Sequence, residues 1–377
     1  MEQALEPAVG DNVVGLILAG GQGKRLWPKS TPERPKQFLR LTGGDHSLLQ
    51  ATFHRLRQLL PPDRIWVVTQ ATYAAEVRDQ LPSLPPGHVI LEPAPRGTAA
   101  AAGLACVMAG WEAGNPVQLI VPADHQVKDE SQFARTLLEA SLVADQDLMV
   151  TVGVPPTRPE TAYGYLKLGE RLSGWPFPVY RVQRFREKPS PPTARRIYQD
   201  GRHLWNAGIF AWKVSVFLTQ VALYLPEHAR ILRQLTGTPA SSRSEAVQSL
   251  YPLLPAISID HGLLERTRTG LAVVPARFEW ADLGSWPSLE RTSPPDAGGN
   301  RCRGNALLRD CSGCLVDWEG REAIIVGVRN LIIAGDGGRL LVCARRHSHL
   351  LADLVQELER HRGEQASAVR GDQPCAS

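Results

Sequence analysis

The sequence has no long hydrophobic run and only a small excess of positive charge. Its longest apolar stretch, residues 13–19, has the length of a β-strand and falls short of the ~20 residues of a membrane-spanning helix. A net charge of +4 over 377 residues argues against nucleic-acid binding. The first ten residues contain no Lys or Arg, unlike the start of a secretory signal peptide. We therefore expect a cytoplasmic protein that binds neither membrane nor nucleic acid.

Cysteine is also scarce, with six residues in the chain. In a cytoplasmic protein such residues are more often thiols than disulfides. Cys311 and Cys314 have C-x-x-C spacing, but no second pair and no histidine at ligand spacing accompanies them. We interpret them as small side chains of a β-rich segment rather than as a zinc site.

Strand-like and helical patterns alternate along residues 1–293. This alternation predicts an α/β fold with a doubly wound, mostly parallel sheet, in which ligands bind at the carboxyl ends of the strands. An Ala-rich segment, residues 97–111, is uniformly small and apolar and indicates a buried helix packed closely against the sheet. The strand-like runs are residues 14–19, 65–68, 89–91 and 117–121.

The pattern changes after residue 293. Residues 294–300 (PPDAGGN) have the composition of a linker. Short β-like pieces separated by turn residues then fill residues 301–349 and predict a small β domain or a β-solenoid fragment. Helical periodicity returns from residue 350, so we expect residues 350–377 to form a C-terminal helix and a mobile polar tail.

The most informative segment is residues 18–28 (LAGGQGKRLWP), followed by residues 35–39 (PKQFL). Three glycines after a buried strand allow backbone N–H groups to converge on an anion, and Lys24, Arg25 and Lys36 add positive charge. The segment is neither a P-loop, because Arg25 stands where Ser or Thr is needed, nor a dinucleotide fingerprint, because Leu26 replaces the third glycine. It predicts a phosphate-binding loop of another kind.

Two aspartates follow strand-like runs. Asp124 lies in residues 119–125 (LIVPADH) and Asp282 in residues 278–286 (FEWADLGSW). A loop aspartate alone is often only part of an Asx turn. Two carboxylates beside a triphosphate would form an oxygen site suited to Mg²⁺.

Three further segments could contact a ligand, although each also has a purely structural interpretation. Gly164, in residues 157–165 (TRPETAYGY), would allow close approach of the backbone. Glu187 and Lys188 end a strand and could form only an ion pair. Asn206, in residues 204–210 (LWNAGIF), needs hydrogen-bond partners if it is buried.

Together these segments resemble the sugar-1-phosphate nucleotidyltransferases, which carry L-A-G-G-x-G-x-R-L-x-P followed by P-K. The continuation P-K-Q-F and the pattern R-P-E-T-x-Y-G-Y are similar to the mannose-1-phosphate guanylyltransferase branch. The motifs V-P-A-D-H, W-x-D-x-G-S-W, F-x-E-K-P and W-N-x-G-x-F also match, and the resemblance spans about residues 13–345. Ala162, Ala207 and Gly97 depart from the family pattern, the first two by small-for-small changes.

The resemblance implies a role for each matching position. Arg25 and Lys36 would hold the triphosphate, Lys188 the sugar phosphate, and Asp124 and Asp282 the catalytic Mg²⁺. Glu92 and Thr98 would contact the guanine, although Glu92 could equally cap a turn, and Asp260 could bind ligand or cap a helix. The remaining residues are Leu18, Ala19, Gly20, Gly21 and Gly23 for the nucleotide, and Gly164, Glu187 and Asn206 for the sugar.

The implied fold is a Rossmann-like nucleotidyltransferase domain followed by a short left-handed β-helix-like domain, the latter a candidate homodimer interface. The implied activity is transfer of GMP from GTP to mannose 1-phosphate with release of pyrophosphate. A related enzyme using glucose 1-phosphate with UTP or dTTP stays open, as does a non-catalytic regulatory homologue that binds nucleotide sugars. Too few residues follow residue 344 for an added isomerase domain, so we expect a monofunctional enzyme.

Overall fold

The computed structural model describes residues 10, 12–21, 23–291, 293–336 and 338–371. The chain forms two compact units. The first combines Met1–Gly20 with Leu49–Trp280, and the second combines Gly21–Leu48 with Ala281–Ser377. This division differs from the expected boundary at residue 293, because the glycine-rich segment and residues 281–293 group with the C-terminal part. Residues 372–377 of the expected tail lie outside the described residues.

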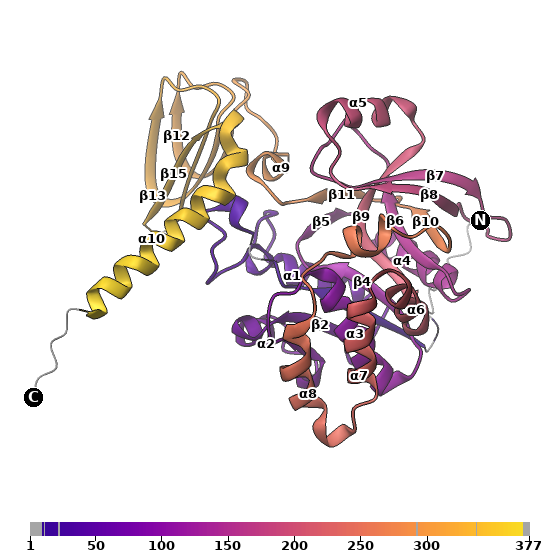
Figure 1. The fold of residues 1–377 in the computed structure, drawn as a ribbon. Helices are drawn as coiled ribbons and strands as arrows, with labels where there is room; N and C mark the ends of the chain where they lie inside the picture. Colours follow the sequence, from indigo (N-terminus) through magenta and orange to yellow (C-terminus); the bar gives the residue numbers. More distant parts are fainter. Residues whose placement is uncertain (1–9, 11, 22, 292, 337, 372–377) are drawn as a thin grey trace, which may run out of the picture. The chain divides into compact units, whose positions relative to one another are not determined.

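The first unit is built on a nine-stranded mixed sheet with the order β3-β2-β1-β4-β9-β6-β10-β8-β7 (Figure 1). Its strands are β1 (Val13–Leu18), β2 (Ile65–Gln70), β3 (Val89–Glu92), β4 (Val117–Pro122), β6 (Met149–Val154), β7 (Tyr165–Arg171), β8 (Tyr180–Arg186), β9 (His203–Lys213) and β10 (Leu271–Pro275). A separate two-stranded sheet pairs β5 (His125–Lys128) with β11 (Glu279–Asp282). The expected α/β class is confirmed.

Parallel pairing is confined to part of this sheet. Strands β3, β2, β1 and β4 are parallel neighbours, as are β6 and β10. Strand β9 runs antiparallel to β4, β6 and β7, and β8 runs antiparallel to β7 and β10. The four parallel strands are almost completely buried, as continuous hydrophobic runs predict. The sheet is therefore less parallel than expected, because antiparallel strands such as β7 and β8 need only a short connection.

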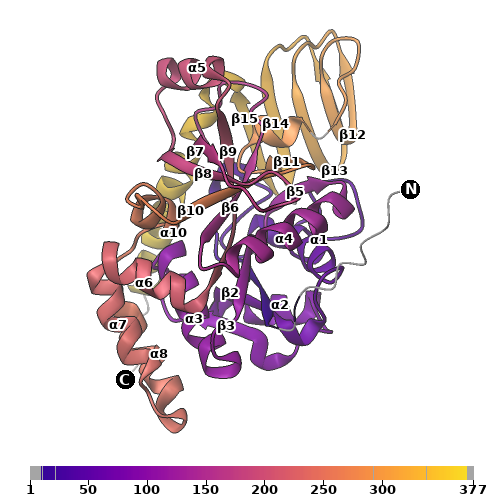
Figure 2. The same ribbon diagram turned by 90° about the vertical axis from the view of Figure 1, so that its right-hand side faces the viewer.

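Helices cover both faces of the sheet (Figure 2). Helices α3, α6 and α7 pack together over side chains such as Leu16 and Val68. The expected buried helix is confirmed as α3, and a Cβ at Gly103 would lie only 2.8 Å from Leu232 of α7. The helices of this unit are α1 (Leu48–Leu56, beginning at the unit boundary), α2 (Ala74–Gln80), α3 (Thr98–Ala113), α4 (Glu130–Ala144), α5 (Pro191–Asp200), α6 (Val214–Tyr224), α7 (Pro226–Thr236) and α8 (Arg243–Leu250).

The second unit contains a four-stranded sheet in the order β12-β13-β14-β15. Its elements are α9 (Trp286–Glu290), β12 (Arg301–Arg309), β13 (Leu315–Val326), β14 (Leu331–Asp336), β15 (Arg339–Ala344) and α10 (Leu351–Gly371). Strands β12, β13 and β14 are parallel neighbours joined by short turns without a crossover helix, which is the arrangement of a β-solenoid. Strand β15 closes the sheet in the antiparallel direction.

The glycine-rich segment packs into the core of this second unit. Leu26, Leu39 and Leu41 share one hydrophobic cluster with Trp286 of α9 and with Leu315, the first residue of β13. The Lys29 ammonium group forms ion pairs of 2.6 Å with Asp317 and 2.5 Å with Glu319 of β13. The segment that carries the expected phosphate-binding loop is therefore held by the C-terminal β-strands.

The described cysteines are free thiols, as expected. Cys311 and Cys314 donate hydrogen bonds to the backbone carbonyls of Ile325 and Val328. None of the helices described is both long and apolar enough to cross a membrane.

Candidate active site

The glycine-rich loop is shaped by close contacts at Gly23. Gly23 has φ 61°, in the left-handed region that favours glycine, and a Cβ there would lie 2.5 Å from Ser30 Oγ and 3.1 Å from the Lys36 side chain. A short 3₁₀ turn, Lys24–Leu26, follows directly. Gly23 therefore lets the chain turn against Lys36, and the turn leaves Arg25 exposed to solvent.

Two expected ligand-binding side chains meet beside this loop. The Lys36 ammonium group lies 3.2 Å from Asp282 Oδ1. Lys36 is buried, with 6% of its surface exposed, whereas the Asp282 side chain is 25% exposed. A Cβ at Gly284 would lie 3.0 Å from Asp282 and 3.1 Å from the Arg25 guanidinium group. Arg25, Lys36 and Asp282 are thus neighbours, and they join two cations to one carboxylate.

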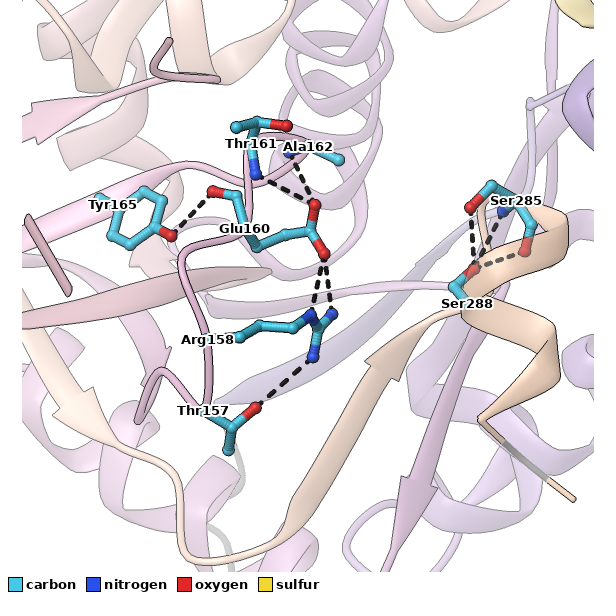
Figure 3. A network of polar contacts seen from close by, with 8 residues as sticks. All are labelled: Thr157, Arg158, Glu160, Thr161, Ala162, Tyr165, Ser285 and Ser288. Carbon is cyan, nitrogen blue, oxygen red and sulfur yellow. Dashed lines mark hydrogen bonds and ion pairs between the residues drawn. The ribbon is translucent and has the colours of Figure 1, made fainter. Parts of the chain in front are cut away.

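A helix cap fixes the turn that follows Asp282. The Ser285 backbone N–H donates to Ser288 Oγ at 3.0 Å, and Ser288 Oγ donates to the Ser285 carbonyl at 2.7 Å (Figure 3). This capping box starts α9 directly after Gly284. The indole N–H of Trp286 donates to the Trp27 carbonyl at 3.1 Å, which joins this turn to the glycine-rich segment. The sequence G-S-W after Asp282 therefore has a structural function.

Asp124 lies in the first unit, in the tight connection between β4 and β5. Two side chains of α1 hold the adjoining backbone, since Thr52 Oγ1 donates to the Ala123 carbonyl at 3.4 Å and Arg55 donates to the His125 carbonyl at 3.3 Å. Burial lowers the pKa of Arg55 to about 10, which still leaves it charged at neutral pH. The position of Asp124 is therefore set by a rigid strand end and a buried cation.

His125 contributes to the surroundings of Asp124 in a defined tautomer. The Trp280 indole N–H donates to His125 Nδ1 at 3.1 Å. Because an indole nitrogen can only donate, a neutral His125 must carry its proton on Nε2. Nε2 lies 3.7 Å from Asp124 Oδ1, so the histidine turns its N–H side towards the carboxylate.

The carboxylate oxygens of Asp124 and Asp282 are chemically suited to Mg²⁺. The described residues contain no group of three or more His, Cys, Asp or Glu side chains placed to hold a metal. Asp124 and Asp282 are carboxylates with side-chain exposures of 22% and 25%, so each is accessible from solvent. Mg²⁺ typically takes one or two carboxylates and completes its shell with waters and substrate phosphates.

The backbone at the end of β1 is fixed by β2, its parallel neighbour. The Ala19 N–H donates to the Val68 carbonyl at 2.8 Å, and Thr69 Oγ1 donates to the Ala19 carbonyl at 3.0 Å. The Gln70 amide donates to the Gly20 carbonyl at 3.0 Å. The expected nucleotide-binding positions Leu18, Ala19 and Gly20 are therefore rigid strand-end backbone.

Glu92 lies beside this strand end. A Cβ at Gly20 would lie 3.1 Å from Glu92 Oε2, so a larger residue there would crowd the carboxylate. Glu92 is buried and accepts a hydrogen bond from the Tyr251 hydroxyl, a partner that the sequence did not reveal. Burial raises the pKa of Glu92, and the hydrogen bond from Tyr251 opposes that rise. The carboxylate is thus already bound on one side within the protein.

Thr98, the other residue expected near the base, starts α3. Its Oγ1 accepts a hydrogen bond from the Ile259 N–H at 2.9 Å. The preceding Gly97 has φ 79°, and a Cβ there would lie 2.5 Å from the Ile257 carbonyl oxygen. Gly97 departs from the family pattern. Because it has no side chain, residues 97–98 can pack closely against residues 257–259.

The expected sugar-side residues gather in one cluster in the first unit. The Asn206 backbone N–H donates to the Gly164 carbonyl at 2.9 Å, and its side-chain amide donates to Asp260 Oδ1 at 2.8 Å. A Cβ at Gly164 would lie 2.6 Å from both Glu187 Oε2 and the Phe185 ring. Gly164, Glu187, Asn206 and Asp260 therefore surround one small polar region.

Asp260 is a half-buried carboxylate of this cluster. Burial raises its pKa to about 6, and the nearby charge of Glu187 adds to the rise. Asn206 Oδ1 in turn accepts from the Thr151 hydroxyl at 2.8 Å, which fixes the orientation of the amide. Asp260 is therefore a member of the cluster and more than a helix cap, and Thr151 is a positioning residue that no local sequence pattern revealed.

Lys188 has an unusual backbone conformation. Its φ of 41° lies in the left-handed region, which long side chains rarely adopt. The ammonium group pairs with Glu187 Oε1 at 2.7 Å while the side chain remains 59% exposed. Strain of this kind costs roughly 1–3 kcal/mol and is frequent at ligand-binding positions.

An ion pair supports the turn that carries Gly164. Arg158 donates to Glu160 Oε2 at 3.1 and 2.9 Å through two guanidinium nitrogens, while Glu160 Oε1 accepts from the N–H groups of Thr161 and Ala162 (Figure 3). The Tyr165 hydroxyl donates to the Glu160 carbonyl at 2.8 Å. The Ala162 contact uses only its backbone, so Ala in place of the family's Gly preserves it. The motif R-P-E-T is thus explained by internal contacts.

Comparison with known proteins identifies the family of this chain. The family model of the nucleotidyl transferases matches residues 14–297. The chain is 33% identical over 352 residues to the xanthan biosynthesis protein XanB of Xanthomonas campestris, which covers 92% of this chain and 73% of that protein. It is 32% identical over 351 residues to the mannose-1-phosphate guanylyltransferase of Klebsiella pneumoniae, which covers 92% of this chain and 74% of the relative.

A solved structure shares the fold as well. The crystal structure described as mannose-1-phosphate geranyltransferase from Thermus thermophilus superposes with a TM-score of 0.81 at 33% identity, over 92% of this chain and 99% of that one. The matches extend beyond the glycine-rich loop to both units. This chain belongs to the nucleotidyl transferase family of enzymes.

Proposed function

We propose that this enzyme transfers GMP from GTP to mannose 1-phosphate and releases pyrophosphate. The observation that carries the proposal is the contact of Lys36 with Asp282 at 3.2 Å beside the exposed Arg25. It combines a cation for phosphate, a carboxylate for a metal and a second cation at one loop. The name of the Klebsiella pneumoniae relative supports the choice of sugar and base.

The reaction needs no protein nucleophile. A phosphate oxygen of mannose 1-phosphate would attack the α-phosphorus of GTP, the new P–O bond would form, and the bond from the α-phosphorus to the bridging oxygen would break as pyrophosphate leaves. Arg25 and Lys36 would stabilise the negative charge of the triphosphate, and Lys188 would orient the incoming phosphate. Positioned cations are therefore the main contribution of the chain.

Asp124 and Asp282 would each supply a carboxylate to Mg²⁺. When bound, the ion would neutralise phosphate charge and so favour departure of pyrophosphate. The 3.2 Å contact with Lys36 holds the Asp282 carboxylate in place before any substrate arrives.

The polar cluster around Gly164 would bind the sugar. Carboxylate and amide groups of Glu187, Asn206 and Asp260 are suited to hydroxyl groups, because a hydroxyl can donate to a carboxylate or an amide oxygen and can accept from an amide N–H. Guanine would be bound near Glu92, since its N–H edge suits a carboxylate acceptor. Tyr251 already donates to that carboxylate and would keep it oriented.

The test is pyrophosphate release from the purified full-length chain with Mg²⁺. GTP, UTP, dTTP and ATP are each combined with mannose 1-phosphate or glucose 1-phosphate. We expect release with GTP and mannose 1-phosphate, abolished by EDTA. Faster release with glucose 1-phosphate and UTP or dTTP would overturn the proposed specificity, and no release in any combination would favour a non-catalytic nucleotide-sugar-binding protein.

Variants separate the metal from general charge effects. Asp124→Asn should reduce turnover severely at every Mg²⁺ concentration while the fold is preserved. Asp79→Asn, which changes an exposed carboxylate of α2, is the matched control and should retain wild-type turnover. Near-normal turnover of Asp124→Asn at saturating Mg²⁺ would remove that residue from the proposed metal site.

We also propose that the C-terminal β-strands bind a second copy of the chain. Leu307, Ile324 and Val326 are 63%, 76% and 56% exposed, and Leu307 lies opposite Ile324 in the pairing of β12 with β13. Such adjacent apolar side chains are typical of interfaces. Analytical ultracentrifugation should show a dimer that Ile324→Lys dissociates, and a monomeric wild-type chain would contradict this proposal.

A further inference from the structure

A basic cavity lies in the first unit between α5 and the strands β7, β8 and β9. Its volume is about 320 Å³. Four of the residues that line it are permanent cations, namely Lys167, Arg184, Arg186 and Arg196, whereas Asp200 is the one acid in the lining. None of these residues has a role in the reaction proposed above.

Strand register explains why the cations gather. In the antiparallel pairing of β7 with β8, Tyr165 lies opposite Arg186 and Lys167 lies opposite Arg184. Lys167 also lies opposite His203 in the pairing of β7 with β9. Directly opposed residues of neighbouring strands point to the same side of a sheet. These side chains therefore share one face.

The sugar-side residues lie on the other face. Leu166, Phe185 and Leu204 alternate with the cavity residues along their strands and belong to the main hydrophobic core. Gly164 and Glu187 lie against one another beside the Phe185 ring on that core side. The cavity is therefore separate from the Gly164 cluster, although only the thickness of the sheet divides them.

Helix α5 forms one wall of the cavity. It contributes Thr193, Arg196, Ile197 and Asp200, at spacings of three, four and seven residues that place them on one side of a helix. Figures 1 and 2 both show α5 above β7, β8 and β9. The cavity thus has a floor of strands and a wall of helix, and three of its four cations, Arg184, Arg186 and Arg196, are exposed to solvent.

The four cations of the cavity outnumber the carboxylates near them, since only Asp200 lines the cavity and Glu265 interacts electrostatically with Arg186. Within the described part of the chain, Lys167, Arg184, Arg186 and Arg196 form no ion pair and no side-chain hydrogen bond. Asp200 Oδ2 lies 3.2 Å from His203 Nδ1, so the one carboxylate faces the histidine. Like charges collected in a partly enclosed space repel one another, and a bound anion would relieve this repulsion. Arginines are especially suited to phosphate because their N–H groups match its oxygens in pairs.

We propose that this cavity binds a small phosphate ester that carries hydroxyl groups, of the size of a sugar phosphate. The four cations would bind the phosphate, while Thr193, Asp200 and His203 offer partners for hydroxyls. A volume of about 320 Å³ is at the small end of the range for ligand pockets, which favours a sugar phosphate over a whole nucleotide. This inference does not depend on the proposed reaction.

The test is calorimetric titration of the full-length chain at fixed ionic strength with glucose 6-phosphate, inorganic phosphate and glucose. Glucose 6-phosphate has no phosphate at its anomeric carbon and so differs from the proposed substrate. We expect it to bind more tightly than inorganic phosphate, and glucose not to bind. Arg184→Gln/Arg196→Gln should weaken its binding at least about tenfold, whereas Arg195→Gln should not change it. Arg195 is exposed on α5 but does not line the cavity, so it is a matched charge control.

Each other result would overturn the inference. Binding that falls equally in Arg195→Gln would show general ionic attraction to the surface. Binding lost in Lys188→Gln but kept in Arg184→Gln/Arg196→Gln would place the ligand at the Gly164 cluster. Inorganic phosphate binding as tightly as glucose 6-phosphate would show an ion site without hydroxyl recognition, and failure of the wild-type chain to bind glucose 6-phosphate would remove the site. An unchanged melting temperature confirms that the variants remain folded.

Discussion

The Lys36 ammonium group lies 3.2 Å from Asp282 Oδ1, although 246 residues separate them in the chain. The pair brings an expected phosphate-binding cation and an expected metal ligand into one place. Because Lys36 is buried and Asp282 is partly exposed, the contact orients the carboxylate while leaving it accessible. Changes at either residue should therefore affect catalysis more than folding.

Lys36→Gln should lower kcat by about 10²–10³, the usual effect of removing one fixed donor that stabilises charge in the transition state. Steady-state pyrophosphate release at saturating substrate measures this change. Lys24→Gln is the control, because Lys24 forms its ion pair with Glu359 of α10 at 2.7 Å. If both variants lose activity equally, the effect arises from the overall charge of the loop.

Gly164→Ala should impair use of the sugar phosphate. The added Cβ would lie 2.6 Å from Glu187 Oε2 and from the Phe185 ring, so one of them must move. Displacement of this order reduces kcat/KM for the sugar phosphate by about ten- to a hundredfold, with little change in KM for the nucleotide. Gly87→Ala has nothing within 4 Å of the new Cβ and should behave as wild type. An equal rise in both KM values would contradict a role on the sugar side.

Lys29→Met should destabilise the second unit. Lys29 and Asp317 are buried at 6% and 1% side-chain exposure, and removal of one partner leaves the other charge unpaired. Urea unfolding should show a loss of about 3–5 kcal/mol. Lys128→Met breaks the exposed pair with Glu279 at 2.9 Å and should cost less than about 1 kcal/mol. Equal losses of unfolding free energy in the two variants would show that the buried Lys29–Asp317 pair stabilises the protein no more than the exposed pair does.

Asp260 should produce a pH dependence that Asp260→Asn removes. Its pKa rises from the ordinary value of 3.8 to about 6 in the folded chain, mainly through burial. A raised carboxyl pKa means that the folded state holds the proton more tightly than the unfolded state does. The protonated Asp260 therefore contributes to the free energy of unfolding fully below pH 3.8, and this contribution is lost as pH rises through about 6.

The measurement is the free energy of unfolding of wild type minus that of Asp260→Asn at a series of pH values. We expect this difference to fall between about pH 4 and about 6 and to stay level above about pH 7. A difference that rises with pH would mean that the Asp260 carboxylate is stabilised in the folded chain, contrary to its burial.

Much of the first unit could be predicted because its parallel strands are continuous apolar runs. The antiparallel strands could not be assigned a direction, since Tyr180–Arg186 and similar segments read alike in either orientation. The direction depends on connection length and on pairing with distant strands. The residue pattern within one strand reveals neither the connection length nor the distant pairing partner reliably.

Which of the candidate site residues lie together could be predicted best where they belong to continuous motifs. Gly164, Glu187 and Asn206 were expected together, and they meet in one cluster. The partners that hold such residues were missed, because Thr151 and Tyr251 stand alone in segments without a recognisable motif. The cations of the basic cavity were missed for the same reason, since Lys167, Arg184 and Arg196 come together only through strand register and helix packing.

The packing of Leu26 and Lys29 against β13 determines which fragments of this enzyme can keep an intact glycine-rich loop. A fragment that ends at residue 293 would contain every expected ligand-binding residue, yet its glycine-rich loop would lack Leu315 and Asp317. Local unfolding of the C-terminal strands would abolish activity even while the nine-stranded sheet remained folded. Thermal inactivation should therefore precede the main unfolding transition. Activity would then depend on the folded state of the C-terminal β-strands.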